Sequence, residues 1–511
     1  MLHSLRLRKC ININQTLCRM IQEKKYDTLC QFIADQIANF NEINITTAYS
    51  KILLMDHYIP NIAYICNILE NKIVKIERNF CLREYCIILN AICKRGKRYE
   101  FGRNLLECLE GRMNDLAIGC RGRDLSTVFW SYAKLKSYPL KTTIDTIENG
   151  ISLLCCEINA NGIGKILWAY TEIGLLPNMK VFDAIQENII KIENYVSSAD
   201  IFKVLVAISK IGIQITNECK RMLDLHVANE LEKTKIFRIQ DIVYSYSIIK
   251  IKPCYKTKTE IIKNIKKTIQ SIEFDEICVI LWGACSLFDV DNEFCCDILC
   301  EIDAFFEIYE TYGDLIVHIK KKIELSQVIL SLQYEDNLSV NMPHFMKILE
   351  TFEPPYLITE NIQLNDRHIE MINEIENTLQ KIGYAVTKNF ICKKTGYCAT
   401  LFLYINTFPV RGEYPTENPF DIITRRTEFV VYIQEIEDED QNESIRTRLK
   451  KRHMKLAGYN NVNISFSDWN TNKNQKNTIE YITSRIYQNS YFNTLLYANT
   501  IAPSVAHQLQ V

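Results

Sequence analysis

The sequence is poor in glycine and proline, with 16 glycines and 11 prolines in 511 residues. This is roughly half the usual share of the two residues, which favours long helices over turn-rich sheets. Long apolar runs are missing as well, because no stretch approaches the roughly 20 residues that a membrane helix needs. A membrane is therefore not among the expected partners.

The chain also lacks an excess of charge, since 60 basic and 61 acidic side chains leave a net charge of −1. Any basic binding surface must then be local. Cysteine is plentiful at 20 residues, but no Cys-x-x-Cys pair occurs. Cysteines such as Cys278 and Cys285, which stand where small apolar residues belong, are expected to be reduced core residues. The tightest group, Cys295, Cys296 and Cys300, has no histidine nearby, so no metal and no other cofactor is predicted.

What the chain does contain is an internal repeat in which a large side chain, here called the anchor, recurs every 38 residues. The anchors are Trp130, Trp168, Val206, Tyr244 and Trp282. Apolar residues lie five, two and one positions before each anchor and two and five positions after it, which makes one stripe of an amphipathic helix. We expect the stripe to form the core and Trp168 to be a core indole. The residue that follows each anchor is small, which lets a neighbouring helix approach closely.

A second amphipathic stretch follows each anchor, and Pro139, Pro177 and Pro253 precede it in three units, where proline suits the first turn of a helix. Each unit is therefore a helix, a short turn and a second helix. One such pair cannot bury its apolar faces alone, whereas stacked copies can. We predict an α-solenoid of ~38-residue repeats over residues 25–340. Four lysines on its exposed face are candidates for RNA contact: Lys134, Lys165, Lys203 and Lys210.

Residues 1–24 begin the chain with basic and apolar residues but no acid before Glu23. The basic residues are Arg6, Arg8, Lys9 and Arg19. A basic, acid-free and potentially amphipathic start is typical of an organelle transit peptide. We therefore predict a targeting segment at residues 1–24, with an ordinary basic helix as the alternative.

The repeat ends near residue 340, and residues 341–367, which contain three prolines, are expected to be a linker. A different pattern follows over residues 368–490. It contains a helix that stops at Gly383, strands at 398–408 and 427–436, a basic helix that stops at Gly458, a strand at 462–469 and a closing helix at 475–488. This order predicts a small α/β domain, with residues 491–511 as a C-terminal tail.

The basic helix of this domain concentrates six cations within ten residues. They are Arg446, Arg448, Lys450, Lys451, Arg452 and Lys455. The acidic run upstream does not alternate with them, so ion pairs between neighbouring turns cannot absorb the charge. Such a cluster suits contacts with RNA phosphates, and we expect the side chains to face solvent. A merely solvated charged face is the alternative.

The stretch "TRLKKRHMKLAGYNNVNISFSDWN" resembles the core of the RAP domain, a small RNA-associated domain of apicomplexan, chloroplast and mitochondrial proteins. The matching residues are Thr447, Leu449, Lys450, Arg452, His453, Gly458, Tyr459, Val462–Ile464 and Asp468–Trp469. The repeat is similar to the octotricopeptide and heptatricopeptide repeats of organellar RNA-binding proteins. Together these resemblances imply an apicomplexan organellar RNA-binding protein, and they add His453 to the RNA-binding candidates.

The resemblance implies residence in the mitochondrial matrix, with the plastid as second choice. The expected partners are mitochondrial RNA, including ribosomal RNA fragments, and mitoribosomal proteins, and no small-molecule substrate is expected. The protein would act in organellar RNA stability, processing or mitoribosome assembly, or as a component of the mitoribosome. A protein-binding α-solenoid scaffold without direct RNA contact is the alternative.

The RAP fold is related to restriction-endonuclease-like enzymes, which makes an RNA-processing nuclease a third function to weigh. Family members carry two acids in the strand before the basic helix, and Tyr432 and Gln434 stand there in this chain. Neither side chain supplies the anionic oxygen that a Mg²⁺ site requires. Glu435 stands where the family has a glycine, and the run of four acids from Glu437 to Asp440 is expected to form a solvated loop. The sequence therefore predicts no catalytic residues and no enzyme activity.

Overall fold

The computed structural model describes residues 2–23, 25–53, 62–95, 103–191, 198–232, 238–269, 271–308, 323–335, 338–349, 366–392, 394–395, 397–407, 425–434, 445–474 and 477–488. The chain divides into two compact units. The N-terminal unit comprises residues 1–211 and 215–235, and the C-terminal unit comprises residues 212–214 and 236–511.

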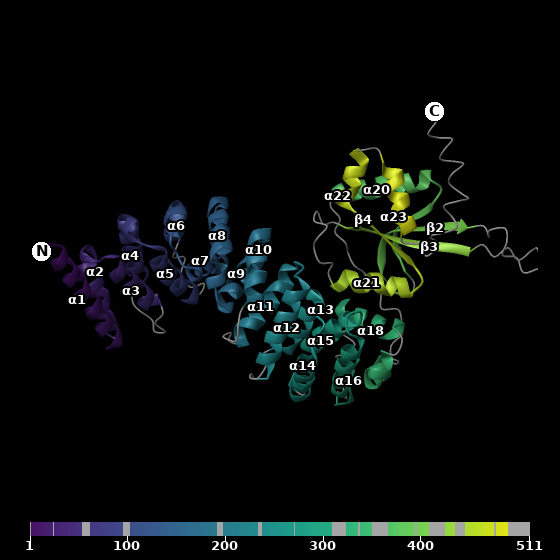
Figure 1. Ribbon diagram of the computed structural model, residues 1–511, viewed down its shortest axis with the longest axis horizontal. Coiled ribbons are helices and arrows are strands. Elements are labelled where there is room, and N and C mark those ends of the chain that lie inside the picture. Colours follow the sequence, from purple (N-terminus) through teal and green to yellow (C-terminus); the bar gives the residue numbers. More distant parts are fainter. Residues whose placement is uncertain are drawn as a thin grey trace, which may run out of the picture. The chain divides into compact units, whose positions relative to one another are not determined.

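The N-terminal unit is a repeat-like array of helices in two layers (Figure 1). Its helices are α1 (Leu2–Gln22), α2 (Tyr26–Gln36), α3 (Glu42–Leu53), α4 (Ile62–Ile76), α5 (Leu82–Arg95), α6 (Arg103–Ala117), α7 (Gly122–Leu135), α8 (Lys141–Leu154), α9 (Ala160–Ile173), α10 (Met179–Lys191), α11 (Ser198–Ile211) and α12 (Asn217–Leu231). Short 3₁₀ turns at Ile37–Asn39, Glu77–Asn79 and Cys155–Glu157 follow α2, α4 and α8. The odd-numbered helices from α3 to α11 pack on one another in sequence, and the even-numbered helices form the second layer.

The apolar stripe is buried as predicted, but the anchors are not core residues. Leu125, Val128 and Phe129 of α7 are fully buried, whereas Trp130 and Trp168 are only partly buried. The reason is helical geometry: with 3.6 residues per turn, the stripe centres about half a turn away from the anchor. The expectation that Trp168 is a core indole is therefore wrong, and the anchors border the outer side of the odd-numbered layer.

The repeated prolines lie outside the first helical turn, contrary to the sequence-based expectation. Pro139 and Pro253 come directly before Leu140 and Cys254, the residues that precede the first turns of α8 and α14. Pro177 stands two residues before the start of α10. All three prolines are buried. An apolar residue at this place packs beneath the first turn and fixes the angle at which the chain enters the helix.

The C-terminal unit continues with helices and ends in an α/β domain. The helices of its first part are α13 (Ile239–Ile249), α14 (Tyr255–Thr268), α15 (Phe274–Leu287), α16 (Asn292–Ile308), α18 (Ile323–Tyr334) and α19 (Pro343–Leu349), with a 3₁₀ turn at Ser339–Asn341. Within this part α15 packs between α13 and α18, and α16 packs against α14 and α19. The predicted linker therefore contains a short helix, α19, while residues 350–365 lie outside the described residues, as does the predicted tail.

The α/β domain is built on a four-stranded sheet in the order β1-β2-β3-β4. Its elements are α20 (Asp366–Lys381), β1 (Ala385–Ile391), β2 (Cys398–Thr407), β3 (Arg425–Gln434), α21 (Ile445–Leu456), β4 (Asn460–Ser465), α22 (Phe466–Asn474) and α23 (Thr478–Gln488). β2 pairs antiparallel with β1 and β3, and α21 connects the parallel pair β3 and β4. α20, α22 and α23 cover one face of the sheet and α21 covers the other (Figure 1).

Two local features of this domain differ from the sequence-based expectation. The first is β1, which was not predicted because Thr387, Lys388 and Asn389 interrupt its apolar residues, and most of its side chains are exposed. The second is the stretch 462–469, where the strand ends at Ser465 and a helix, α22, begins at Phe466. Trp469 of α22 is a packed core residue, as predicted, and its indole N–H donates a hydrogen bond of 3.1 Å to Glu374.

Candidate functional site

The basic helix α21 lies between two other parts of the C-terminal unit. On one side Leu449 and Met454 are fully buried, and Met454 belongs to the core beneath the sheet. The other side packs on α15 and α18, which belong to the first part of the same C-terminal unit, α13 to α19, here called its helical array. The helix stops as predicted at Gly458, whose φ of 99° lies in the left-handed region that glycine adopts without strain. α21 is therefore an internal layer of the unit rather than a surface helix.

Two arginines of α21 reach the C-terminal ends of two neighbouring array helices. Arg448 Nη2 donates a hydrogen bond of 2.8 Å to the carbonyl oxygen of Ser247, in the last turn of α13, and also contacts the hydroxyl of Ser286. Arg452 Nη2 donates a hydrogen bond of 2.8 Å to the carbonyl oxygen of Cys285, in the last turn of α15. The last carbonyls of a helix lack partners within the helix and form the negative end of its dipole. The two guanidinium groups therefore bind where the array presents negative partial charge.

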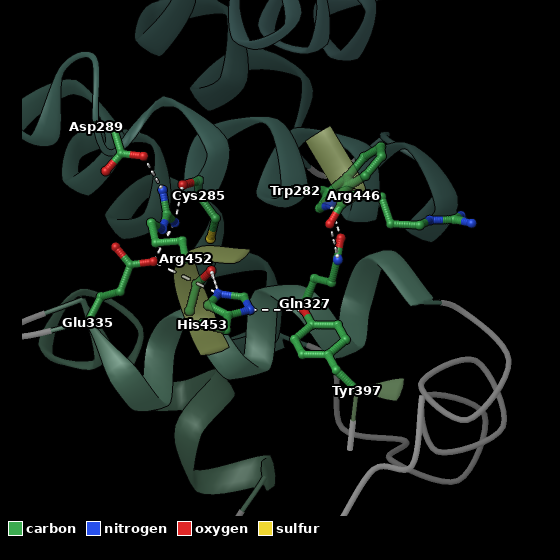
Figure 2. A network of polar contacts seen from close by, with 10 residues as sticks. Trp282, Cys285, Asp289, Gln327, Glu335, Tyr397, Arg446, Arg452 and His453 are labelled. Atoms are coloured by element: carbon green, nitrogen blue, oxygen red, sulfur yellow. Dashed lines mark hydrogen bonds and ion pairs between the residues drawn. The ribbon is translucent and has the colours of Figure 1, made fainter. Parts of the chain in front are cut away.

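His453 joins the array to the sheet (Figure 2). Its side chain is 0% exposed, with Nε2 2.8 Å from the Ser331 hydroxyl on α18 and Nδ1 2.9 Å from the Tyr397 hydroxyl just before β2. Burial, reinforced by the charge of Arg452, lowers the pKa of His453 to about 3. The ring is therefore neutral at physiological pH, and each ring nitrogen has a hydroxyl as its partner.

Gln327 of α18 makes a second bridge between the array and α21 (Figure 2). Its amide nitrogen donates a hydrogen bond of 2.8 Å to the carbonyl oxygen of Arg446, and its amide oxygen accepts one of 2.8 Å from the indole N–H of Trp282. The last anchor of the repeat is thus tied, through one fully buried glutamine, to the start of the basic helix.

A buried carboxylate, Glu335, directly follows α18 and forms an ion pair with Arg452. The Glu335 side chain is 2% exposed and that of Arg452 is 13% exposed. Arg452 also bonds Asp289 at 3.1 Å and lies 5.6 Å from the ring centroid of Phe288. Burial raises the pKa of Glu335 to about 7, against the lowering effect of the nearby guanidinium. The carboxyl group therefore titrates near neutral pH.

These two titrations predict an acid response of the interface between α21 and the array. His453, with its lowered pKa, contributes stability that is complete above its ordinary pKa of 6.5 and is lost as pH falls toward about 3. Glu335, with its raised pKa, contributes in the opposite sense, since the folded state takes up its proton as pH falls from about 7 toward 4.5. The two effects oppose each other between pH 6.5 and 4.5, so we expect the wild-type stability to change little there and to fall below that window.

Glu335→Gln should remove the opposing term, so the loss of stability should begin near pH 6.5, with a slope of up to about 1.4 kcal/mol per pH unit. Urea denaturation of the full chain at pH 7.5, 5.5 and 4.0 measures both curves. If the free energy of unfolding depends on pH in the same way in the variant and the wild type, this account is wrong.

The structure places the predicted RNA-binding residues of α21 in different surroundings. Lys450 is only 7% exposed and Arg452 is largely buried, so the expectation that these two side chains face solvent is wrong. His453 is fully buried. The ammonium of Lys450 lies 5.8 Å from the ring centroid of Tyr397. Arg446, Arg448 and Lys451 are partly buried, and Lys455 is exposed. Two of the six cations, Arg448 and Arg452, are bound by groups of the preceding helices.

The four predicted lysines of the solenoid belong to the N-terminal unit. Lys134, Lys203 and Lys210 are exposed and Lys165 is partly buried. Lys203 forms an ion pair of 3.1 Å with Asp200. The ammonium of Lys165 lies 5.3 Å from the ring centroid of Trp130. Two of these lysines, Lys134 and Lys165, therefore stand beside anchor side chains.

Sequence reasoning missed the partners that the array offers to α21. A signal for them exists along α18 and the residue that follows it, where Gln327, Ser331 and Glu335 stand at four-residue intervals and are all buried. Residues four apart lie on one face of a helix, so a polar stripe in an apolar helix indicates a partner with matching polar groups. On α21 the pair Arg448 and Arg452 has the same spacing.

The described residues also bear on membrane spans and on metal binding. Among these, no helix is long and apolar enough to cross a membrane. Across the same ranges, no group of three or more His, Cys, Asp or Glu side chains could hold a metal ion. Tyr432 and Gln434 lie in β3, while Glu435 and the acidic run from Glu437 to Asp440 lie outside the described residues.

The chain thus combines a repeat-like helical array with a small α/β domain that docks on it through a basic helix. Residues 429–485, which include most of β3 and all of α21, β4 and α22, match the family model of the RAP domain. The chain therefore contains a RAP domain, a module generally linked to RNA binding and processing. No curated protein matches the chain.

Proposed function

We propose that the protein binds RNA in the mitochondrial matrix and acts there in RNA stability, processing or ribosome assembly without catalysing a reaction itself. The RAP domain at residues 429–485 carries this proposal, because the module is linked to RNA binding and processing. The helical array supports it, since stacked helical repeats offer an extended surface along which a chain-like partner can lie. Ribosomal RNA fragments are the proposed targets, and stable residence in the mitochondrial ribosome is one form this function can take.

The cellular test is crosslinking of the tagged protein to RNA, followed by sequencing of the RNA recovered. We expect mitochondrial ribosomal RNA to be enriched over a tag-only control. The docking of α21 favours a second candidate, a protein-binding scaffold, because the array takes up cations that would otherwise be offered to phosphates. A scaffold recovers no RNA above background, and that result would refute the proposal.

Lys451 and Lys455 are the residues of α21 through which the RAP domain is expected to contact RNA. Lys455 is exposed and Lys451 is partly exposed, so both ammonium groups are accessible to solvent. Lys451→Glu with Lys455→Glu should weaken binding to all RNAs alike. Each lost phosphate contact with a single strand should flatten the dependence of log affinity on log salt by roughly 0.7. Lys180→Glu, at an exposed lysine of α10, is the matched control, and an equal salt slope in both proteins would contradict the assignment.

Imaging of the tagged protein tests the compartment, and the structure indicates which N-terminal residues can be deleted without disturbing the fold. Ile13 and Leu17 in the second half of α1 are buried, so removing the whole helix would also disturb the array. Deletion of residues 2–9 removes three of the basic residues, Arg6, Arg8 and Lys9, and leaves those contacts in place. We expect the tagged full chain in mitochondria and the deleted form in the cytosol. A cytosolic full chain would contradict the mitochondrial assignment, and a plastid signal would support the second choice.

The absence of catalysis is proposed from the residues of β3. Tyr432 and Gln434 stand where related domains carry acids, and neither offers an anionic oxygen to Mg²⁺. Purified protein incubated with labelled RNA and Mg²⁺ should leave the RNA intact. Cleavage that is lost on replacing Glu435 or Glu437 would instead establish a nuclease.

A further inference from the structure

Two anchor tryptophans of the N-terminal unit lie side by side on the odd-numbered helix layer. Trp130 of α7 and Trp168 of α9 are both partly exposed, and their ring centroids are 6.5 Å apart. The apolar stripe that holds α7 and α9 in the array lies on the opposite side of each helix. These indoles therefore form an aromatic surface beside the core rather than part of it.

Lysines accompany both rings in a crosswise arrangement. The ammonium of Lys165, on α9, lies 5.3 Å from the ring centroid of Trp130, on α7. The ammonium of Lys134, on α7, lies 5.9 Å from that of Trp168, on α9. Both lysines come from positions that helical periodicity puts on the same side as the anchor. Each aromatic plane thus has a cation from the neighbouring repeat beside it.

The surroundings of this aromatic pair are positively charged. The pKa of Lys165 is lowered, first by burial and then by the charges of Arg123 and Lys94, with a smaller contribution from Lys203. These three cations lie on α7, α5 and α11, and Lys203 is paired with Asp200. Basic side chains therefore occur on three consecutive helices of the layer, although the net charge of the chain is close to zero. Such side chains suit an anionic partner.

Two anchors of the C-terminal unit occupy the same repeat position as Trp130 and Trp168, and one of them takes part in packing between helices. There Tyr244 and Trp282 lie 5.9 Å apart, and the indole N–H of Trp282 is bonded to Gln327, which also binds α21. In the N-terminal unit lysines stand beside the paired rings. The same repeat position thus serves domain docking in one unit and is accompanied by cations in the other.

We propose that Trp130, Trp168, Lys134 and Lys165 form a binding site for single-stranded RNA, an inference that rests on the RNA-binding function proposed above. Exposed aromatic planes stack on bases of any sequence, provided that the bases are not already paired, while the cations follow the backbone. A lysine held over an indole has a flexible stem, so its ammonium can turn to a phosphate as the ring receives a base. The site would therefore be tolerant of sequence but selective for single strands.

The test measures binding of the full chain to a fluorescein-labelled oligouridine of about 12 nucleotides, a length in the range of known single-strand sites. Trp130→Leu and Trp168→Leu keep an apolar side chain but remove the stacking plane. Each should weaken binding about 5- to 150-fold, the range that the loss of one stacked base produces. Tyr255→Leu, at an exposed aromatic residue of α14, is the matched control and should bind as the wild type does.

Lys134→Met and Lys165→Met provide a second pair of variants that leave both indoles in place, and they should weaken binding and flatten its salt dependence. Melting followed by circular dichroism identifies any variant that fails to fold. A chain that binds the oligouridine equally well with and without the tryptophans would overturn the site but leave the proposed function standing. An RNA duplex that binds as tightly as the single strand would likewise overturn the site alone. A wild-type chain that binds no RNA would overturn both, and the surface would then suit an acidic protein segment.

Discussion

Replacing Arg452 with leucine is expected to destabilise the C-terminal unit by about 3 kcal/mol. The substitution removes the hydrogen bond to the Cys285 carbonyl and the bond to Asp289, and it leaves the carboxyl group of Glu335 buried without its cation. Removing one partner of a buried ion pair is costly because the remaining carboxyl group has lost its water and must either stay charged without a partner or take up a proton. Urea denaturation of the full chain at pH 8, where Glu335 is ionised in the wild type, measures the loss.

Lys455→Leu is the matched control, because Lys455 lies on the same helix but is exposed, and it should change stability by less than about 0.5 kcal/mol. A double-mutant cycle with Glu335→Gln separates the two causes. If the stranded carboxylate dominates, the double variant should be less destabilised than the sum of the single variants by about 1–3 kcal/mol. Equal stability of the Arg452→Leu and Lys455→Leu proteins would show that α21 does not dock as described.

Much of the fold could be predicted from the sequence because it depends on periodicity. The stripe from Leu125 to Leu135 repeats in later helices, and apolar residues spaced in this way have to be buried against neighbours. The anchors were misjudged because a large aromatic residue at a fixed repeat position looks like core in a sequence. Only their angular position around the helix axis shows that Trp130 and Trp168 lie on the side opposite the buried stripe. β1 was missed because its three polar residues stand together between two apolar pairs, so this edge strand lacks the alternation that indicates burial.

The site could be predicted only in part. A run of basic residues shows that a helix is positively charged, but it does not show which groups those side chains contact in the folded protein. Cations four residues apart, such as Arg448 and Arg452, lie on one side of α21 whether that side meets RNA, water or another domain. The choice depends on groups far away in the sequence, the carbonyl ends of α13 and α15 and the carboxylate of Glu335. A tertiary partner of this kind has no local signature, apart from the polar stripe on α18 that complements it.

The second large effect is expected from Glu148, a buried carboxylate in the N-terminal unit. Glu148 lies on α8 and accepts hydrogen bonds from the Tyr170 hydroxyl of α9 at 2.8 Å, the backbone N–H of Asn178 at 3.2 Å and the side-chain amide of Asn178 at 2.6 Å. Asn178 in turn accepts a hydrogen bond from the N–H of Val181 in the first turn of α10. One side chain thus ties three consecutive helices of the array together.

Glu148→Ala should destabilise the N-terminal unit by about 3 kcal/mol, because it leaves the buried hydroxyl of Tyr170 and the donors of Asn178 without an acceptor. Glu148→Gln keeps a side-chain oxygen in place and should cost less, about 1 kcal/mol. Glu187→Ala, at an exposed acid of α10 that pairs with Lys191, is the control and should lie within about 0.5 kcal/mol of the wild type. Adding Tyr170→Phe to Glu148→Ala should recover part of the loss, since the stranded hydroxyl is then absent. Thermal denaturation of the full chain measures these changes. If Glu148→Ala has the same midpoint as the Glu187→Ala control, the carboxylate is not the link between these helices, and apolar packing alone holds the repeats in register.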